Sequence, residues 1–125
     1  MINHIWGNIY IGDEQDALSQ GYVNRIGITA VLDLRELHID EKLDKEAAHQ
    51  VEEAIIELKR LTSNGNKVLV HCHAGMDRAP FVVAYYLHVW AGYSFQDAYY
   101  LVKWNRPQTI EHWEWFSQFK EEARA

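Results

Sequence analysis

The chain has 125 residues, of which 48% are hydrophobic and 24% are charged. This composition is typical of a folded globular protein and excludes a disordered chain, and the length suits one domain spanning residues 1–125. The formal net charge is −6, from 12 basic and 18 acidic residues. That charge argues against general binding to nucleic acid or to an anionic membrane.

Two features of the sequence bear on location. No apolar run is long enough to cross a bilayer, and the first residues lack the basic segment and apolar stretch of a signal peptide. The chain has one cysteine, Cys72, so no intrachain disulfide can form. A reducing compartment suits a lone thiol, and we therefore expect a cytoplasmic protein.

The N-terminal part predicts a strand followed by a short helix. Residues 5–12 carry alternating apolar side chains and predict an edge strand. Residues 13–20 are compatible with a short helix that is capped near Asp13 and ended by Gly21. These elements lead into residues 30–34, an apolar run typical of a buried strand.

The middle of the chain predicts a loop and a long amphipathic helix. Residues 36–42 are polar with weak periodicity, which indicates a loop, whereas residues 43–61 repeat apolar side chains every three or four positions. Residues 63–66 form a Ser-Asn-Gly-Asn turn signal that would stop this helix. The helix then feeds a second apolar run, residues 67–71, so we expect a parallel strand–helix–strand unit with a right-handed crossover.

The C-terminal half is predicted to be helical. Apolar spacing favours a buried helix over residues 79–91, a second helix capped by Ser94, and a last helix over residues 110–122, with a break at Pro107. Together the elements predict an α/β fold with a small, mostly parallel central sheet and helices on both sides. A ligand site is expected at the C-terminal end of a central strand.

The loop between the strand at 67–71 and the helix at 79–91 starts with Cys72 and ends with Arg78. A loop entering a helix N-terminus directs backbone N–H groups into one concavity, and the helix dipole adds positive potential there, so the loop is suited to bind an anion. The same field favours a thiolate, and we expect Cys72 to be ionised near neutral pH. Gly75 would permit a left-handed turn, and the guanidinium of Arg78 could bind two phosphate oxygens. The loop therefore predicts nucleophilic chemistry on a phosphate.

Residues 71–78, His-Cys-His-Ala-Gly-Met-Asp-Arg, resemble the His-Cys-x5-Arg signature of cysteine-dependent protein tyrosine phosphatases, and the Cys-x-Ala-Gly-x-x-Arg form is most similar to the dual-specificity branch. Residues 9–12 and 27–34 are similar to the opening of dual-specificity phosphatases, so the resemblance covers most of the chain. It implies a compact phosphatase that acts through a phosphocysteine, without metal or cofactor. It makes Cys72 the nucleophile and assigns phosphate binding to His73, Ala74, Gly75, Met76, Asp77 and Arg78.

The resemblance also implies a general acid on the loop before the long helix, which would protonate the leaving oxygen. Asp40 is the first candidate, and Glu41 and Asp44 are alternatives. Asp40 or Asp44 could instead only cap the helix. Asp77 is a further candidate, because myotubularin-like lipid phosphatases and some bacterial tyrosine phosphatases carry aspartate at that position. Its alternative role is to hold the loop by accepting backbone hydrogen bonds.

Three other residues near the motif have expected roles. His71 would lie under the loop and orient its backbone, unless it is a satisfied core histidine. Gln108 belongs to a segment that resembles the Gln-Thr segment of tyrosine phosphatases, and it could position the hydrolytic water or simply lie in a surface turn. Ala79 stands where most relatives have a hydroxyl that helps the thiolate leave. Ala79 cannot supply this help, so we expect a slow second step. Plant glucan phosphatases have a similar Arg-Ala-Pro sequence here, so the resemblance implies that alanine does not by itself abolish turnover.

The resemblance implies a phosphorylated protein or another phosphomonoester as the binding partner. Phosphotyrosine is the first substrate candidate, followed by phosphoserine or phosphothreonine, and then by a phosphoglucan or phosphoinositide. Two other readings stay open. Rhodanese-type sulfurtransferases also place a cysteine loop at a helix N-terminus, and a phosphate-binding module without turnover would keep the same loop.

Overall fold

The computed structural model describes residues 1–39 and 43–117. Its centre is a four-stranded sheet in the order β1-β2-β4-β3, in which β4 pairs in parallel with both β2 and β3, while β1 is antiparallel to β2. The strands are β1 (Asn3–Trp6), β2 (Ile9–Gly12), β3 (Ala30–Asp33) and β4 (Val68–His71). The small, mostly parallel sheet that the sequence predicts is confirmed.

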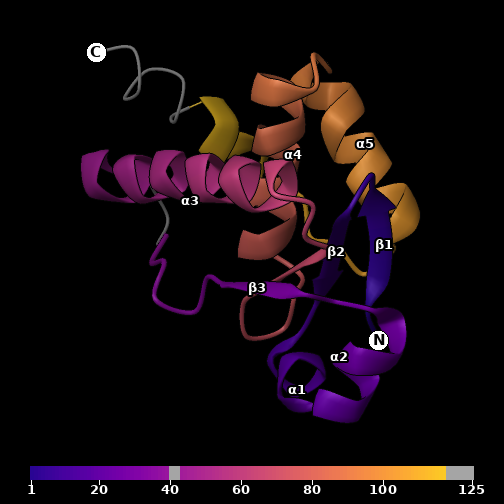
Figure 1. Ribbon diagram of the computed structural model, residues 1–125. Helices are drawn as coiled ribbons and strands as arrows, with labels where there is room; N and C mark the ends of the chain where they lie inside the picture. The colour runs from indigo at the N-terminus through magenta and orange to yellow at the C-terminus, as the bar shows by residue number, and fades with distance from the viewer. Residues whose placement is uncertain (40–42, 118–125) are drawn as a thin grey trace.

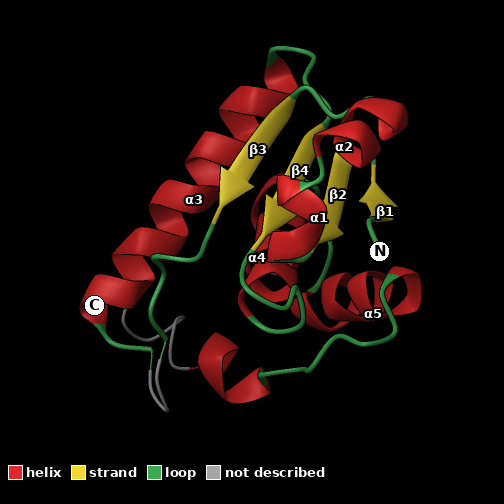
Figure 2. Cartoon of the chain, turned by 90° about the horizontal axis from the view of Figure 1, so that it is seen from below, coloured by secondary structure: helices red, strands yellow, loops and turns green. Residues whose placement is uncertain are grey.

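Helices cover both faces of this sheet, as predicted (Figures 1 and 2). The helices are α1 (Glu14–Leu18), α2 (Gln20–Ile26), α3 (Lys45–Ser63), α4 (Arg78–Trp90) and α5 (Phe95–Asn105). Along β4, Val68 and Val70 join the large core beneath α3, α4 and α5, whereas Leu69 joins a smaller cluster with Val23 of α2. This alternation is what period-two side-chain geometry requires of a strand buried on both faces.

The sheet edges differ from the sequence prediction. Residues 5–12 form a hairpin and not one edge strand, because Gly7 adopts a φ of +53° and reverses the chain between β1 and β2. β2 is therefore an interior strand. Residues 30–34 were expected to be buried, but β3 is the edge strand and leaves Val31 exposed. A run of apolar residues indicates that at least one face of a strand is buried, but it does not indicate the position of the strand in the sheet.

The first helical region also differs from the prediction at its end. Asp13 caps α1 as expected, with its carboxylate accepting from the amide of Asp16. The helix stops at Leu18, and α2 then runs through Gly21. Gly27, with a φ of +90°, provides the left-handed residue that ends α2.

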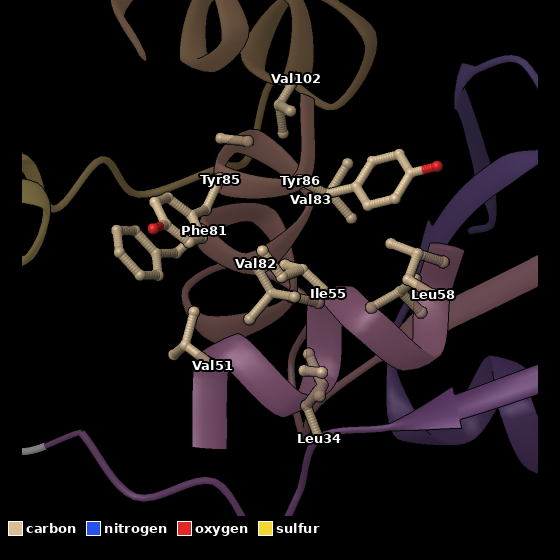
Figure 3. Close-up of a cluster of buried hydrophobic side chains, with 14 of the residues drawn as sticks. Leu34, Val51, Ile55, Leu58, Phe81, Val82, Val83, Tyr85, Tyr86 and Val102 are labelled. Atoms are coloured by element: carbon tan, nitrogen blue, oxygen red, sulfur yellow. The ribbon is translucent and has the colours of Figure 1, made fainter. Parts of the chain in front are cut away.

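The long helix α3 packs on α4 and forms the main core (Figure 3). Asp44 caps α3 and its apolar stripe is buried, which confirms the predicted amphipathic helix. The buried side chains of this stripe are Ala47, Ala48, Val51, Ala54, Ile55 and Leu58. Among them, Val51, Ile55 and Leu58 lie in one buried cluster with Phe81, Val82 and Val83 of α4 (Figure 3), so the core fixes α4 relative to the sheet. None of the helices within 1–39 and 43–117 is both long and apolar enough to span a membrane.

Candidate active site

Six residues join the end of β4 to the start of α4, at the C-terminal edge of the sheet. Cys72 directly follows the strand, and its side chain is buried, with 2% of the residue exposed. Arg78 is the first residue of α4, so the positive end of this 13-residue helix lies at the loop. The strand–loop–helix arrangement that the motif needs is thus present.

Gly75 is fixed by its surroundings. Its φ is +67°, which disfavours any side chain. A Cβ at this position would lie 2.4 Å from the carbonyl oxygen of Gly12 and 2.6 Å from Nη2 of Arg106. Only glycine therefore allows the loop to pack this closely on β2 and on Arg106.

Arg106 holds the loop from beneath, a role that the sequence reading missed. This arginine is 1% exposed, and its Nε donates to the carbonyl of Gly75 at 2.6 Å while Nη2 donates to that of Ala74 at 3.5 Å. Nη1 donates to the N-terminal strands through the carbonyl of Ile11 and the amide oxygen of Asn3. Burial lowers the pKa of Arg106 below its usual value. The available signal was spacing, because Arg106 continues the buried α5 stripe of Ala98 and Val102.

Arg78 links the loop to the segment after β3. Its Nη1 donates to the carbonyls of Leu34, Arg35 and Leu37, at 3.4, 3.1 and 2.8 Å. These bonds hold the start of the segment that leads to the predicted acid loop. Within the described parts of the chain, the hydrogen bonds of Arg78 use this one guanidinium nitrogen.

The acid candidates fall into three groups. Asp40 and Glu41 lie outside the described residues. Asp44 is the N-cap of α3, where Oδ1 accepts from the amide of Ala47 at 2.8 Å, so the capping alternative describes its contact. Asp77 makes no capping bond to α4, and its Oδ1 lies instead 2.7 Å from Nε2 of His112.

The supporting residues are placed as follows. His71 is buried under the loop, with Nδ1 3.2 Å from the carbonyl oxygen of Cys72 and Nε2 3.7 Å from Oδ1 of Asp33. This contact fits the expected role of orienting the loop backbone. Gln108 is exposed in the turn after α5, and its role in positioning water stays a prediction.

Charged groups surround the loop on the side of α1. Nδ1 of His73 lies 2.7 Å from Glu14, which also pairs with Arg35 at 3.4 Å. Arg35 donates to both oxygens of Asp33, and these hydrogen bonds lower the pKa of Asp33 to about 2. The hydrogen bond from His73 lowers the pKa of Glu14. Within the described residues, no group of three or more His, Cys, Asp or Glu side chains could hold a metal ion.

A family model and curated relatives both place this chain among the dual specificity phosphatases. Residues 9–124 match the model of the dual specificity phosphatase catalytic domain. A relative from Invertebrate iridescent virus 6 is 30% identical over 111 residues, covering 79% of this chain and 75% of the relative. Protein-tyrosine-phosphatase IBR5 of Arabidopsis thaliana is 30% identical over 121 residues, covering 90% of this chain but 47% of the relative. The chain thus spans less than half of this plant protein.

Solved structures support the same fold. Human DUSP28 superposes with a TM-score of 0.81 at 18% identity, covering 98% of this chain and 93% of that one. A mouse dual specificity phosphatase complexed with zinc tungstate gives a TM-score of 0.83 at 19% identity, covering 98% and 86%. At these identities the likeness concerns the fold alone. Because the family model matches nearly the whole sequence, the chain belongs to the dual-specificity phosphatase family of cysteine-dependent protein phosphatases.

Proposed function

We propose that this chain hydrolyses phosphomonoesters through a phosphocysteine on Cys72, with phosphotyrosine proteins as the first substrate class. The observation that carries the proposal is the position of Cys72 between the end of β4 and the N-terminus of α4, with Gly75 and Arg78 at their motif positions. This arrangement offers a nucleophile and an electropositive helix end to one tetrahedral anion. No metal or cofactor is needed for this chemistry.

In the proposed first step, the sulfur of Cys72 attacks phosphorus and the bond from phosphorus to the leaving oxygen breaks. Asp40 gives that oxygen a proton. In the second step, water attacks phosphorus and gives up a proton to a base, the phosphorus–sulfur bond breaks and its electrons return to sulfur. Amides of residues 73–77 and the guanidinium of Arg78 would hold the phosphoryl oxygens throughout.

The names of similar proteins support the substrate class without defining it. IBR5 is named a protein tyrosine phosphatase, a mouse relative is dual specificity protein phosphatase 12, and the mouse neighbour is complexed with zinc tungstate, which contains a tetrahedral oxyanion. Phosphoserine and phosphothreonine follow as substrates, and phosphoglucans or phosphoinositides come next. We also propose a cytoplasmic location and expect neither nucleic-acid nor membrane binding, on the basis of the lone cysteine and the negative net charge.

A non-catalytic phosphate-binding module is the second candidate. One neighbour with a TM-score of 0.79 at 18% identity, covering 98% of this chain, is a human tyrosine phosphatase-like serine/threonine/tyrosine-interacting protein. Ala79 favours this alternative, because it lacks the hydroxyl that would help the thiolate leave.

Phosphate release from p-nitrophenyl phosphate and from phosphopeptide, phosphoglucan and phosphoinositide panels tests the proposal. We expect turnover by the wild type and none by Cys72→Ser, which should still bind phosphate. We expect Asp40→Asn to slow release most for poor leaving groups, because these depend on protonation. Ala79 predicts a burst of nitrophenol before the steady state. Turnover that survives Cys72→Ser would contradict the mechanism, whereas phosphate binding without any turnover would favour the binding module.

A further inference from the structure

The segment after α5 contacts the phosphate loop at two adjacent residues. The amide of Ile110 donates to the carbonyl of Met76 at 2.8 Å, and Nε2 of His112 lies 2.7 Å from Oδ1 of Asp77. The other ring nitrogen of His112 lies 3.0 Å from Oε1 of Glu114. An imidazole therefore bridges two carboxylates at the edge of the loop.

The ring of His112 is held by the core. It stacks on Trp115 with ring centroids 3.7 Å apart and planes at 8°, and Trp115 in turn meets Phe81 of α4 edge to face. The backbone amide of His112 donates to the hydroxyl of Tyr99 at 3.2 Å. Burial raises the pKa of that hydroxyl, so Tyr99 stays neutral. These contacts fix the orientation of the imidazole toward Asp77.

Both members of the pair can still exchange protons with solvent. The side chain of Asp77 is 40% exposed and that of His112 is 21% exposed. The charged and titratable groups around His112 are Asp77 from the loop, Glu114 and Glu111 from its own segment, and Tyr99 from α5. Two carboxylates and no described cation touch the ring.

We propose that Asp77 and His112 form the proton-accepting pair for the second step, hydrolysis of the phosphocysteine. This inference rests on the proposed function and extends it. Asp77 is the loop residue directly before Arg78, and its carboxylate is 40% exposed, so a water molecule entering the loop can reach it. Gln108 is exposed in its turn, whereas the side chain of His112 contacts the loop.

The oxygen of water bonds to phosphorus as the phosphorus–sulfur bond breaks, and the electron pair of that bond returns to Cys72. Asp77 takes the proton of the attacking water, and His112 shares it through the 2.7 Å contact. The pair then releases the proton to solvent after phosphate leaves. Asp77 would touch the reacting water, whereas His112 acts through Asp77 and is a positioning residue.

Rapid-mixing kinetics with p-nitrophenyl phosphate test this assignment. The burst rate constant reports transfer to Cys72, and the steady-state kcat reports hydrolysis when the second step is slow. A positioned proton-transfer group contributes roughly 10²–10⁴-fold, so we expect Asp77→Asn to lower kcat by about 100-fold and leave the burst rate constant unchanged. His112→Gln keeps a donor to Asp77 but cannot titrate, and it should lower kcat less.

The pH profile separates a proton-transfer role from a structural one. Protonation of His112 would weaken Asp77 as a base, so kcat of the wild type should fall on the acid side. In His112→Gln that acid limb should move to lower pH. Glu114→Gln, which keeps the ring, should shift the limb in the same direction because it removes one of the two carboxylates that contact the imidazole.

His49→Gln is the matched control, since His49 also pairs with a carboxylate, Glu53 at 2.6 Å, but lies exposed on α3. It should keep the wild-type kcat and pH profile. An unmoved acid limb in both His112→Gln and Glu114→Gln would overturn the pair, as would a burst rate constant that falls with kcat in Asp77→Asn. Loss of the Cys72 requirement would instead refute the proposed function itself.

Discussion

Arg78 and Arg106 divide the support of the phosphate loop between them. Arg106 is buried and donates hydrogen bonds from all three guanidinium nitrogens, and two of these nitrogens hold the backbone carbonyls of residues 74–75. Arg78 is half-buried and donates to carbonyls of residues 34–37 from Nη1. Arg106 fixes the shape of the loop from beneath, and Arg78 connects the loop to the segment that leads to the predicted acid.

We expect Arg106→Met to lower the free energy of unfolding by about 3 kcal/mol, because it leaves buried carbonyls of the loop and of β2 without donors. Activity should fall as well, since the loop loses its support. Urea unfolding and phosphate release measure the two effects. Arg25→Met is the control, because Arg25 is exposed on α2 and should cost little. Equal stability of the two variants would contradict the role assigned to Arg106.

Among the residues at the site, those that are close together in the chain could be predicted from the sequence. The motif from His71 to Arg78 identified the loop, because its glycine, strand and helix are local. Arg106 and His112 were missed, because each reaches the loop through a contact with a residue more than 30 positions away. The sequence does not distinguish an arginine or a histidine that contacts the loop from one that lies on the surface. Only the packing of α5 and of the segment after it shows that Arg106 and His112 reach the loop.

Helix α3 shows how a candidate acid can serve as a cap. Asp44 accepts from the amide of Ala47, and substitution of such a cap by alanine typically costs about 1 kcal/mol. We expect Asp44→Ala to lower the free energy of unfolding by that amount and to leave phosphate release unchanged. Ser94→Ala, which removes the matching cap of α5, is the control for the size of the effect. A loss of turnover greater than the loss of stability explains would make Asp44 the acid.

The helices were predicted better than the sheet for a physical reason. The stripe of α3, its cap at Asp44 and the cap of α5 at Ser94 are local signals with a 3.6-residue period. Strand order depends on which strands pair after the crossovers, and the residues of β3 carry no local sequence signal for an edge position. The hairpin turn requires a residue with a left-handed conformation, which Gly7 provides, but a single glycine between apolar residues is a weak sequence signal for a hairpin.

The whole molecule carries a net charge of −6, yet its proposed substrate is an anion. Long-range repulsion of this kind is screened beyond about 8–10 Å at physiological salt. The local field of the α4 N-terminus and of Arg78 acts within that distance. Binding of an oxyanion is thus expected to depend on the loop and not on the overall charge.

Binding at the loop should stabilise the entire fold, because the loop joins β4 to α4 and contacts β2 and the segment after α5. A ligand at 100 times its Kd adds about 2.7 kcal/mol to the free energy of unfolding. We expect saturating inorganic phosphate or tungstate to raise the unfolding midpoint of the wild type and of Cys72→Ser alike, as measured by thermal melting. Arg78→Lys should melt lower and gain much less from the same ligand, because an ammonium cannot replace the planar guanidinium. Equal ligand-induced shifts in the wild type and Arg78→Lys would place the anion elsewhere on the molecule.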